Sequence, residues 1–301
     1  SLGQKIELEK VMIFSGGGGV NGATTFILQG LNTAFCGVVG RDLAGQEIIE
    51  GLSQSEIDIE MIKVKPGKLT DLGLIFHADS ERTILLHHGA SRFFGEKDID
   101  WQKLGETKWL YIAPLWGKAA DLTEKLVDFA GENKIKIAFN PSLDQLALKN
   151  ISQALKKTDV LILNDGEASF LTGIKPYREN KVFQHISHSV RSYGSGDMFK
   201  SDFRQIIVIT KGKNGASAFD GRLLYQVKAP EVKVVDATGA GDSFGSGFVA
   251  GLIQGKNCEK SLQLAMANAI SNIQVFGANR GLLRKNPVLL KIKVEKTRWS
   301  A

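Results

Sequence analysis

Cysteine is scarce in this sequence, which has only Cys36 and Cys258 among its 301 residues. A disulfide scaffold needs more cysteines, so we expect both thiols to stay reduced in the core of a cytoplasmic protein. Long apolar runs are also missing: none approaches the roughly 20 residues that a membrane-spanning helix requires. No positively charged start with an apolar core follows the pattern of a secretory signal. The composition therefore favours a cytoplasmic globular protein without a membrane partner.

Two classes of nucleotide-related protein find little support. The Gly-Lys pairs in GKLT (67–70), GKAA (117–120) and GKNC (255–258) lack the spacing of a Walker A loop, which excludes a P-loop NTPase. The net charge of +6 is dispersed along the chain, except in the basic segment 284–298. This distribution favours attraction of a polyanionic small substrate over nucleic-acid binding.

Histidine is too sparse and too scattered to predict a metal site. His87 and His88 are neighbours in a predicted strand, so their side chains point to opposite faces and cannot chelate one ion. His185 and His188 share a helical face, but no third ligand accompanies them.

What the sequence has in abundance is alternation between apolar strand-like runs and helical runs. Continuous apolar strands separated by helices are typical of a parallel sheet covered on both faces, so we predict a three-layer α/β/α domain with a mostly parallel central sheet. The predicted strands are 33–39, 108–114, 134–140, 159–164 and 205–210, and the predicted helices are 19–30, 44–53, 119–132, 150–156, 240–254 and 258–276.

Two regions interrupt this alternation. Residues 57–88 read as three alternating strands without helices between them, and we expect them to form a small antiparallel sheet together with 9–16. Such a sheet outside the main one would act as a lid over the strand ends. Residues 176–204 are polar and predict a helix followed by a mobile loop. The expected organisation is a single domain, 1–301, with lid strands from about 9–16 and 57–88.

The first glycine-rich segment, SGGGGVNGAT (15–24), has two interpretations. Gly17, Gly19 and Gly22 satisfy G-x-G-x-x-G between a predicted strand and a predicted helix. Asp42 follows about 20 residues later, as the ribose-binding acid of a dinucleotide site does. The alternative is a glycine turn that serves backbone geometry alone. The motif by itself does not decide between these two interpretations.

The second glycine-rich segment is VKVVDATGAGDSFGSGFV (232–249), in which a β-rich run ends at Asp236 and a helix follows. A helix N-terminus has unpaired N–H donors and a partial positive charge, so it suits a phosphate. Asp242 lies in the first helical turn, where a carboxylate either caps the helix or accepts a proton from an attacking hydroxyl. An acid beside an anion site is explained if a neutral alcohol lies between them, which indicates phosphoryl transfer to an alcohol.

Five elements in the expected order make the chain resemble the PfkB (ribokinase-like) carbohydrate kinase family. They are GGGGVNGA with FCGVVGRDLAG, NDGE (164–167), TKGKNGA (210–216), DATGAGDSFGSGF (236–248) and ANAISNIQVFGANRG (267–281). The resemblance runs over nearly the whole length and implies the ribokinase-like three-layer α/β/α fold with a small antiparallel β lid.

The resemblance also implies roles for individual residues. Asp242 would be the catalytic base, beside an anion hole formed by the N–H groups of Gly239, Ala240 and Gly241. The acceptor would enter beside Gly16, Gly17, Gly18 and Asn21, whereas Arg41 and Asp42 would be mainly structural. Mg²⁺ and the triphosphate would be held by Asn164 and Glu167, largely through water; Asn164 is alternatively a helix cap.

On the nucleotide side, the resemblance implies that ATP lies along Thr210, Gly212, Asn268, Gly277 and Ala278. For the last three, a buried helix face is the competing interpretation. Asp236 with the loop 274–281 would form a site for a monovalent cation such as K⁺.

Three departures from the family pattern stand out. Gly18 occupies a position where ribokinase usually has Lys, so this sequence is not expected to be ribokinase. Ala237 stands where Thr is common, which is expected to weaken the cation site and spare the base. The family normally begins with a core strand bearing a sugar-binding Asp, and no position of this sequence corresponds to that carboxylate.

We therefore predict an ATP- and Mg²⁺-dependent kinase for a small sugar, sugar phosphate or nucleoside. The alternatives are an NAD(P)-linked oxidoreductase that uses Gly17, Gly19 and Gly22, and a nucleotide-binding protein without catalysis. An exposed lid edge would be open to pairing with a second copy of the chain, so a homodimer is a further expectation.

Overall fold

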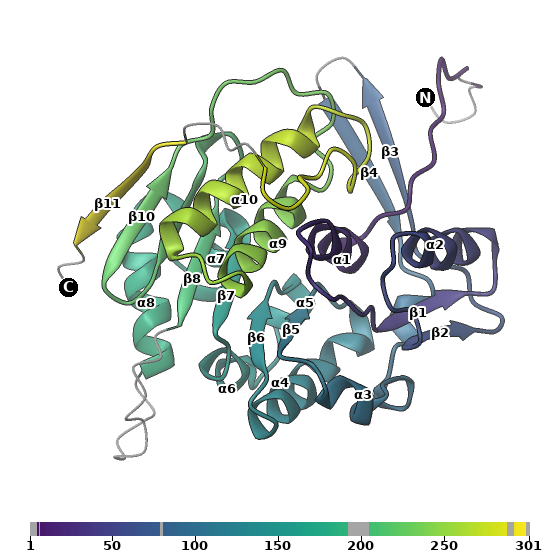
Figure 1. The fold of residues 1–301 in the computed structure, drawn as a ribbon, viewed down its shortest axis with the longest axis horizontal. Coiled ribbons are helices and arrows are strands. Elements are labelled where there is room, and N and C mark those ends of the chain that lie inside the picture. The colour runs from purple at the N-terminus through teal and green to yellow at the C-terminus, as the bar shows by residue number, and fades with distance from the viewer. Residues whose placement is uncertain (1–4, 6, 79–80, 192–204, 288–291, 299–301) are drawn as a thin grey trace.

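A seven-stranded sheet forms the centre of the computed structural model, which describes residues 5, 7–78, 81–191, 205–287 and 292–298 (Figure 1). Its order is β11-β10-β9-β8-β7-β6-β5. Strands β5 (Trp109–Ile112), β6 (Lys136–Phe139), β7 (Val160–Asn164) and β8 (Ile206–Thr210) are parallel. Antiparallel pairing adds β9 (Ala216–Phe219), β10 (Leu223–Val227) and β11 (Val294–Arg298). The predicted mostly parallel sheet is confirmed.

Helices cover both faces of this sheet because successive strand residues point to opposite sides. Leu161 and Leu163 of β7 belong to one buried cluster, and Val160 and Ile162 to another. The first cluster lies under α4 (Leu122–Glu132), α6 (Ile151–Lys156), α7 (Asp165–Thr172) and α8 (Glu179–Arg191); the second lies under α1 (Gly18–Leu28), α9 (Ala240–Ile253) and α10 (Cys258–Ile273). The short helices α3 (Trp101–Gly105) and α5 (Leu143–Leu146) complete the first face. The three-layer α/β/α prediction is confirmed.

The predicted strand 33–39 is not part of the central sheet. The chain forms β1 (Gly37–Gly40), which pairs in parallel with β2 (Ile62–Lys65) in a separate two-stranded sheet. This sheet and α2 (Leu43–Gln54) enclose a small apolar cluster that includes Val20, Leu52 and Ile57. An apolar run of this length predicts a buried strand but does not specify which sheet it joins.

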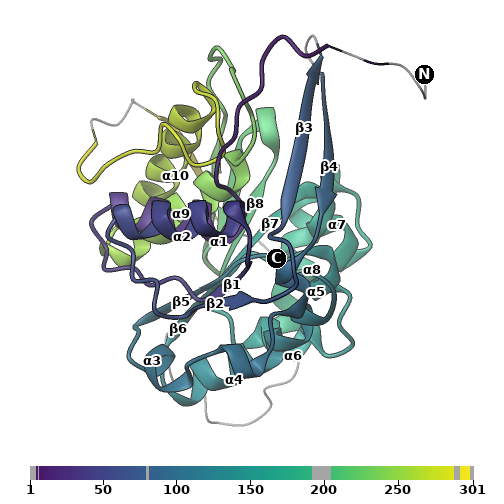
Figure 2. The same ribbon diagram turned by 90° about the vertical axis from the view of Figure 1, so that its right-hand side faces the viewer.

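The lid is smaller than expected and differs in composition. Only β3 (Leu72–Ala78) and β4 (Glu81–His87) form the antiparallel hairpin, which projects from the rest of the molecule (Figure 2). β2 pairs with β1 instead, and residues 9–16 adopt no strand. Val11 and Ile13 of that segment are exposed, so its apolar alternation reflects no burial within the described residues.

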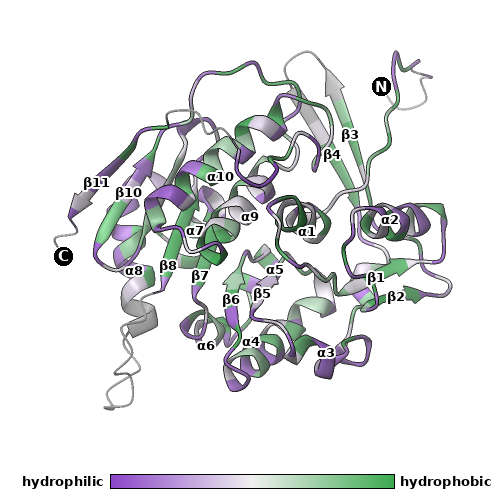
Figure 3. Cartoon of the chain, in the orientation of Figure 1, coloured by the Kyte–Doolittle hydropathy of each residue, from purple (hydrophilic) through white to green (hydrophobic). Residues whose placement is uncertain are grey.

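Hydropathy follows the layers except at the hairpin. The central strands β7 and β8 are hydrophobic and enclosed, whereas β3 is hydrophobic and exposed (Figure 3). In the region 176–204, the predicted helix is present as α8, and the predicted mobile loop at 192–204 lies outside the described residues.

Candidate active site

The carboxyl ends of the parallel strands carry polar side chains next to the N-terminus of α9. Asn164 and Thr210 end β7 and β8 and are register partners, so they lie side by side. Asn140 follows β6 and donates from Nδ2 to the carbonyl oxygen of Ile162 at 3.1 Å. Open parallel sheets bind their ligands at the carboxyl ends of the strands, and the polar side chains at these strand ends indicate a binding site there.

The turn that starts α9 requires glycine. Gly239 is the N-cap with φ of 79°, a left-handed conformation. A Cβ atom at this position would lie 2.1 Å from the carbonyl oxygen of Ala278, so any side chain would displace the loop beyond α10. This close approach brings Ala278 to the helix N-terminus.

The anion hole expected there is partly occupied by the chain itself. The Ala240 amide donates to the carbonyl oxygen of Ala237 at 3.4 Å, which is long for a hydrogen bond. For the amides of Gly239 and Gly241, the described residues provide no partner. A Cβ at Gly241 would meet nothing within 4 Å, so the approach to this turn is open.

Asp242 is half-buried in the first turn of α9 and is held by a residue from the first glycine segment. Asn21 donates from Nδ2 to Asp242 Oδ2 at 2.8 Å. Burial raises the pKa of Asp242, and the hydrogen bond from Asn21 opposes that rise. The carboxylate is therefore oriented by an amide and is a stronger base than an exposed aspartate.

The first glycine segment borders the other carboxylate oxygen. A Cβ at Gly18 would lie 2.9 Å from Pro114 Cδ and 3.4 Å from Asp242 Oδ1. A Cβ at Gly16 would lie 3.8 Å from Ala278 Cβ, so this segment packs against the loop beyond α10. Gly17 is the N-cap of α1 with φ of 90°. The residues predicted to bind the acceptor and the predicted base are thus brought together.

Asn164 and Glu167 form a capping box at the start of α7. The Glu167 amide donates to Asn164 Oδ1 at 2.9 Å, and the Asn164 amide donates to Glu167 Oε2 at 2.8 Å. Burial raises the pKa of Glu167 and the hydrogen bond with Asn164 lowers it, while the Asp242 charge raises it further. Glu167 therefore lies in the electrostatic field of Asp242, and the capping interpretation of Asn164 holds at the same time.

The predicted nucleotide turn follows β8. Gly212 has φ of 51° and open space where a Cβ would be. Lys211 Nζ contacts Glu179 Oε1 at 3.1 Å and donates to Ser217 Oγ at 2.7 Å, which fixes the turn against α8 and β9. Thr210 and Gly212 remain accessible on the edge that Asn164 shares.

Asp236 holds two loops together with its carboxylate. Oδ1 accepts from the Thr238 amide at 2.9 Å and Oδ2 from the Gly277 amide at 3.2 Å. Gly277 has φ of 105°, and a Cβ there would meet the Phe14 ring at 3.3 Å. Asp236 is 6% exposed, so its first role is to close this loop.

Asn268 lies in the core. It is fully buried, its Nδ2 donates to the Ser243 carbonyl at 2.8 Å, and its Oδ1 accepts from the Leu283 amide at 2.8 Å. Both ends of the amide join α10 to α9 and to the segment beyond it, as the core-helix interpretation predicts, and a place for Asn268 beside ATP stays a prediction.

Asp42 has a structural role, which removes the dinucleotide interpretation of the first glycine segment. It caps α2 by accepting from the Gly45 amide at 2.9 Å, and it accepts from the Thr70 amide at 2.7 Å and from Thr70 Oγ1 at 2.6 Å. The hydrogen bonds from Thr70 lower the pKa of Asp42. The strand that should precede a G-x-G-x-x-G loop is also absent from 9–16.

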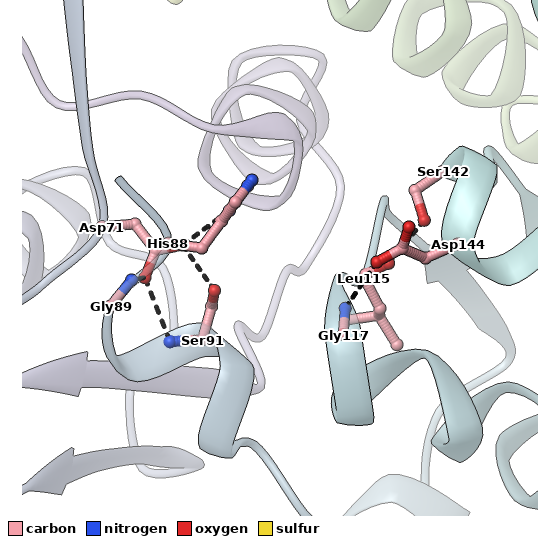
Figure 4. A network of polar contacts seen from close by, with 8 residues as sticks. All are labelled: Asp71, His88, Gly89, Ser91, Leu115, Gly117, Ser142 and Asp144. Carbon is pink, nitrogen blue, oxygen red and sulfur yellow. Dashed lines mark hydrogen bonds and ion pairs between the residues drawn. The ribbon is translucent and has the colours of Figure 1, made fainter. Parts of the chain in front are cut away.

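A polar network fixes the base of the lid (Figure 4). Asp71, just before β3, accepts from the amides of Gly89 and Ser91 at 3.0 Å each and from Ser91 Oγ. His88 Nδ1 lies 3.5 Å from Asp71 Oδ2, and its ring packs on Trp116 with centroids 4.9 Å apart. Across from it, Asp144 accepts from the Gly117 amide at 2.7 Å. Asp71 thus joins the two ends of the hairpin beside the end of β5.

No cluster of three or more His, Cys, Asp or Glu side chains suited to a metal occurs in the described part of the chain.

The sequence analysis did not identify Tyr111, Pro114 and Asn140 as site residues. The signal available was their position at the carboxyl ends of predicted parallel strands, which is where such sheets bind ligands. None of the helices within the described ranges is long and apolar enough to span a membrane.

Comparison with known proteins agrees with this geometry. A family model described as pfkB family carbohydrate kinase matches residues 2–285. The chain is 25% identical to a ribokinase of Lactococcus lactis, over 97% of this chain and 90% of the relative. It is 24% identical to a cytidine kinase of Thermococcus kodakarensis, over 87% and 88%.

Solved structures show the same fold. An Arabidopsis thaliana ribokinase complexed with ribose and ATP superposes with a TM-score of 0.74 at 21% identity, covering 94% of this chain and 89% of that one. An E. coli protein provisionally described as ribokinase II, in complex with ATP and Mg²⁺, gives 0.75 at 22% identity, covering 94% and 91%.

Proposed function

The chain belongs to the pfkB family of carbohydrate kinases, and on that premise we propose that it transfers the γ-phosphoryl group of ATP to a hydroxyl of a small polyhydroxy acceptor with Asp242 as the general base. The observation that carries this proposal is the Asn21–Asp242 hydrogen bond of 2.8 Å at the open N-terminus of α9. It joins the acceptor segment to the predicted base in one site.

The Asp242 carboxylate provides the base chemistry. Oδ2 is held by Asn21, which leaves Oδ1, on the side of Gly18, to accept the acceptor's proton. The raised pKa makes the carboxylate a better proton acceptor, since base strength and pKa rise together. Because Gly18 has no side chain, an alcohol oxygen can approach Oδ1 closely.

The amides at the start of α9 provide the anion site. Those of Gly239 and Gly241 would stabilise the charge that develops on the transferred group, and the dipole of a 14-residue helix would add to them. The Ala240 amide contributes only if its long bond to Ala237 opens.

The residues at the end of β7 fit a hydrated Mg²⁺. That ion keeps several waters and takes one or two carboxylates together with phosphates. Asn164 and Glu167 offer oxygen donors, and the charge of Asp242 that raises the pKa of Glu167 is one that a dication would relieve. When bound, the ion neutralises phosphate charge. ATP would extend from there along Thr210, Gly212, Gly277 and Ala278.

The class of acceptor is a sugar, a sugar phosphate or a nucleoside. The relatives of this chain include a ribokinase, a cytidine kinase, a ribose-1-phosphate kinase and a 6-phosphofructokinase. The hairpin β3–β4 would close over the acceptor and exclude water, which prevents wasteful hydrolysis of ATP.

The decisive experiment measures ADP release with D-ribose, deoxyribose, cytidine, inosine, ribose 1-phosphate and fructose 6-phosphate. We expect acceptor-dependent release with at least one of them. Asp242→Asn should lower kcat by about 100-fold to 10,000-fold, the range that general bases contribute. ATP affinity, measured by titration calorimetry, should stay nearly unchanged. Full turnover of the variant would refute the mechanism, and no release with any acceptor would favour the alternative of a binding protein without catalysis.

Asp236 and the loop 274–281 would contribute to a K⁺ site if the cation replaces the amide contacts of Asp236.

The hairpin β3–β4 would pair with a second copy of the chain, because exposed apolar side chains occupy both of its faces and only one face can turn toward the acceptor. They are Leu72, Leu74, Phe76 and Leu85 on one face, and Ile84 and Leu86 on the other.

A further inference from the structure

Two buried polar atoms near Asp242 lack hydrogen-bond partners. They are the hydroxyl oxygen of Tyr111 and the Oδ1 atom of Asn21, for which the described residues supply no donor or acceptor. Native interiors pair the great majority of such atoms, because an unpaired buried polar group lowers the stability of the fold. Both atoms therefore call for an explanation other than stability.

The hydroxyl of Tyr111, on β5, lies against α9 in the neighbourhood of Asp242. Its ring packs edge-on against Phe26 with centroids 5.3 Å apart, and a Cβ at Gly22 would lie 3.3 Å from its Cε1 atom. The hydroxyl itself lies 3.3 Å from where a Cβ of Gly245 would be, one turn beyond Asp242 on α9. Glycines on two helices thus leave room for the phenol.

The electrostatics agree with this placement. Burial raises the pKa of Tyr111, and the charges of Asp242 and Glu167 raise it further. The phenol therefore stays protonated and retains its donor in the field of the two carboxylates of the site. Phenylalanine would fill the same space without a buried polar atom, so the hydroxyl is better explained by a ligand than by packing.

We propose that Tyr111 is a further specificity-determining residue, whose hydroxyl and the Oδ1 atom of Asn21 bind one hydroxyl group of the acceptor beside Asp242. This inference rests on the proposed kinase function. The ligand group must donate to Asn21 Oδ1, which accepts only, and must exchange a hydrogen bond with the phenol. An alcohol meets both requirements, whereas a phosphate ester at this point donates nothing and is repelled by Asp242. The site thus selects an acceptor by a hydroxyl next to the one that reacts.

The test is Tyr111→Phe, with Tyr225→Phe as the matched control. Tyr225 lies on β10 and is buried, and its hydroxyl has a partner, because it donates to Asp220 Oδ2 at 2.9 Å. Without acceptor, Tyr111→Phe should raise the melting temperature by about 2 °C, because an unpaired polar atom is removed. Tyr225→Phe should lower it by a similar amount.

With the acceptor that the wild-type protein uses, Tyr111→Phe should raise KM for the acceptor about fivefold to tenfold, as expected for one lost hydrogen bond. KM for ATP should not change, and Tyr225→Phe should change neither constant. For the wild type, an acceptor analogue that lacks the neighbouring hydroxyl should show the same rise in KM relative to the intact acceptor. Tyr111→Phe should not raise the KM for this analogue any further.

The outcomes separate this inference from the proposed function. If the wild type is active and Tyr111→Phe has the same KM for the acceptor, the role of Tyr111 is overturned and the kinase function is left intact. A wild type that releases no ADP with any acceptor overturns the proposed function. In that case the melting temperatures still decide whether the hydroxyl is unpaired: a variant less stable than the wild type shows that Tyr111 already has a partner, and overturns the inference.

Discussion

At the scale of single residues, the site depends on one hydrogen bond between distant parts of the chain. Asn21 and Asp242 are 221 positions apart, and their contact orients the carboxylate that we propose as the base. Burial raises the pKa of this carboxylate, and the hydrogen bond from Asn21 opposes that rise. The amide of Asn21 therefore affects both the position and the pKa of the proposed base.

Replacement of Asn21 by Ala should move the acidic limb of the pH profile of kcat/KM to higher pH. Burial raises the pKa of Asp242 and Asn21 lowers it, so loss of Asn21 leaves only the rise. The base must be ionised, and activity is lost as pH falls through its pKa. At pH 7 we expect kcat/KM to fall about tenfold, as for loss of a hydrogen bond to a charged group. A profile that only scales down, with its limb unmoved, would contradict this assignment.

At the scale of elements, the lid is joined to the core by its two ends. The carboxylate of Asp71 accepts hydrogen bonds from Gly89 and Ser91, which lie on the far side of the hairpin in sequence. The ring of His88 connects the same point to Trp116 beyond β5. A two-stranded hairpin is marginal by itself, so these contacts set its position.

Asp71→Ala should loosen the hairpin while sparing the core. Loss of the hydrogen bonds to backbone amides should lower the unfolding free energy by about 1–3 kcal/mol. We also expect faster amide exchange across β3–β4, a higher KM for the acceptor and more ATP hydrolysis without acceptor, since a loose lid admits water. The matched control is Asp144→Ala, which removes a similar carboxylate–amide contact on the core side. Equal effects of the two variants on acceptor KM would argue against a lid role.

At the scale of the whole molecule, the proposed lid and the proposed dimer contact belong to the same hairpin, β3–β4. It is exposed on both faces, and the same apolar patch on a second copy would be complementary to itself, as in most homodimers. One face of the hairpin β3–β4 would then close over the acceptor, and the other face would be covered by the second copy.

Leu86→Lys should shift a homodimer toward monomer in analytical ultracentrifugation, because a charge on the lid face opposes its burial. Leu86 is 62% exposed, so the fold of the single chain should be unaffected. Exposed Leu43→Lys, on α2, serves as the control. A wild-type chain that is monomeric at all concentrations would refute dimerisation through the lid.

Much of the fold could be predicted because it is encoded locally. The helices and central strands appear close to their predicted bounds, since caps such as Asn164 and apolar periodicity act within a few residues. What failed was the assignment of strands to sheets. The run at 33–39 ended in a separate pair with β2, and 9–16 formed no strand, because the pairing partner and not the run decides these outcomes.

The sequence by itself determined the family motif around Asp242, the mostly parallel sheet and the helices that cover it, because short-range hydrogen bonding and hydrophobic periodicity are properties of contiguous residues. Only the tertiary structure decided that Asn21 holds the carboxylate of Asp242, that Asn268 is buried in the core, and that the hydroxyl of Tyr111 is left unpaired near Asp242. Those three results depend on packing between segments far apart in the chain, and no local pattern records which side chains will meet there.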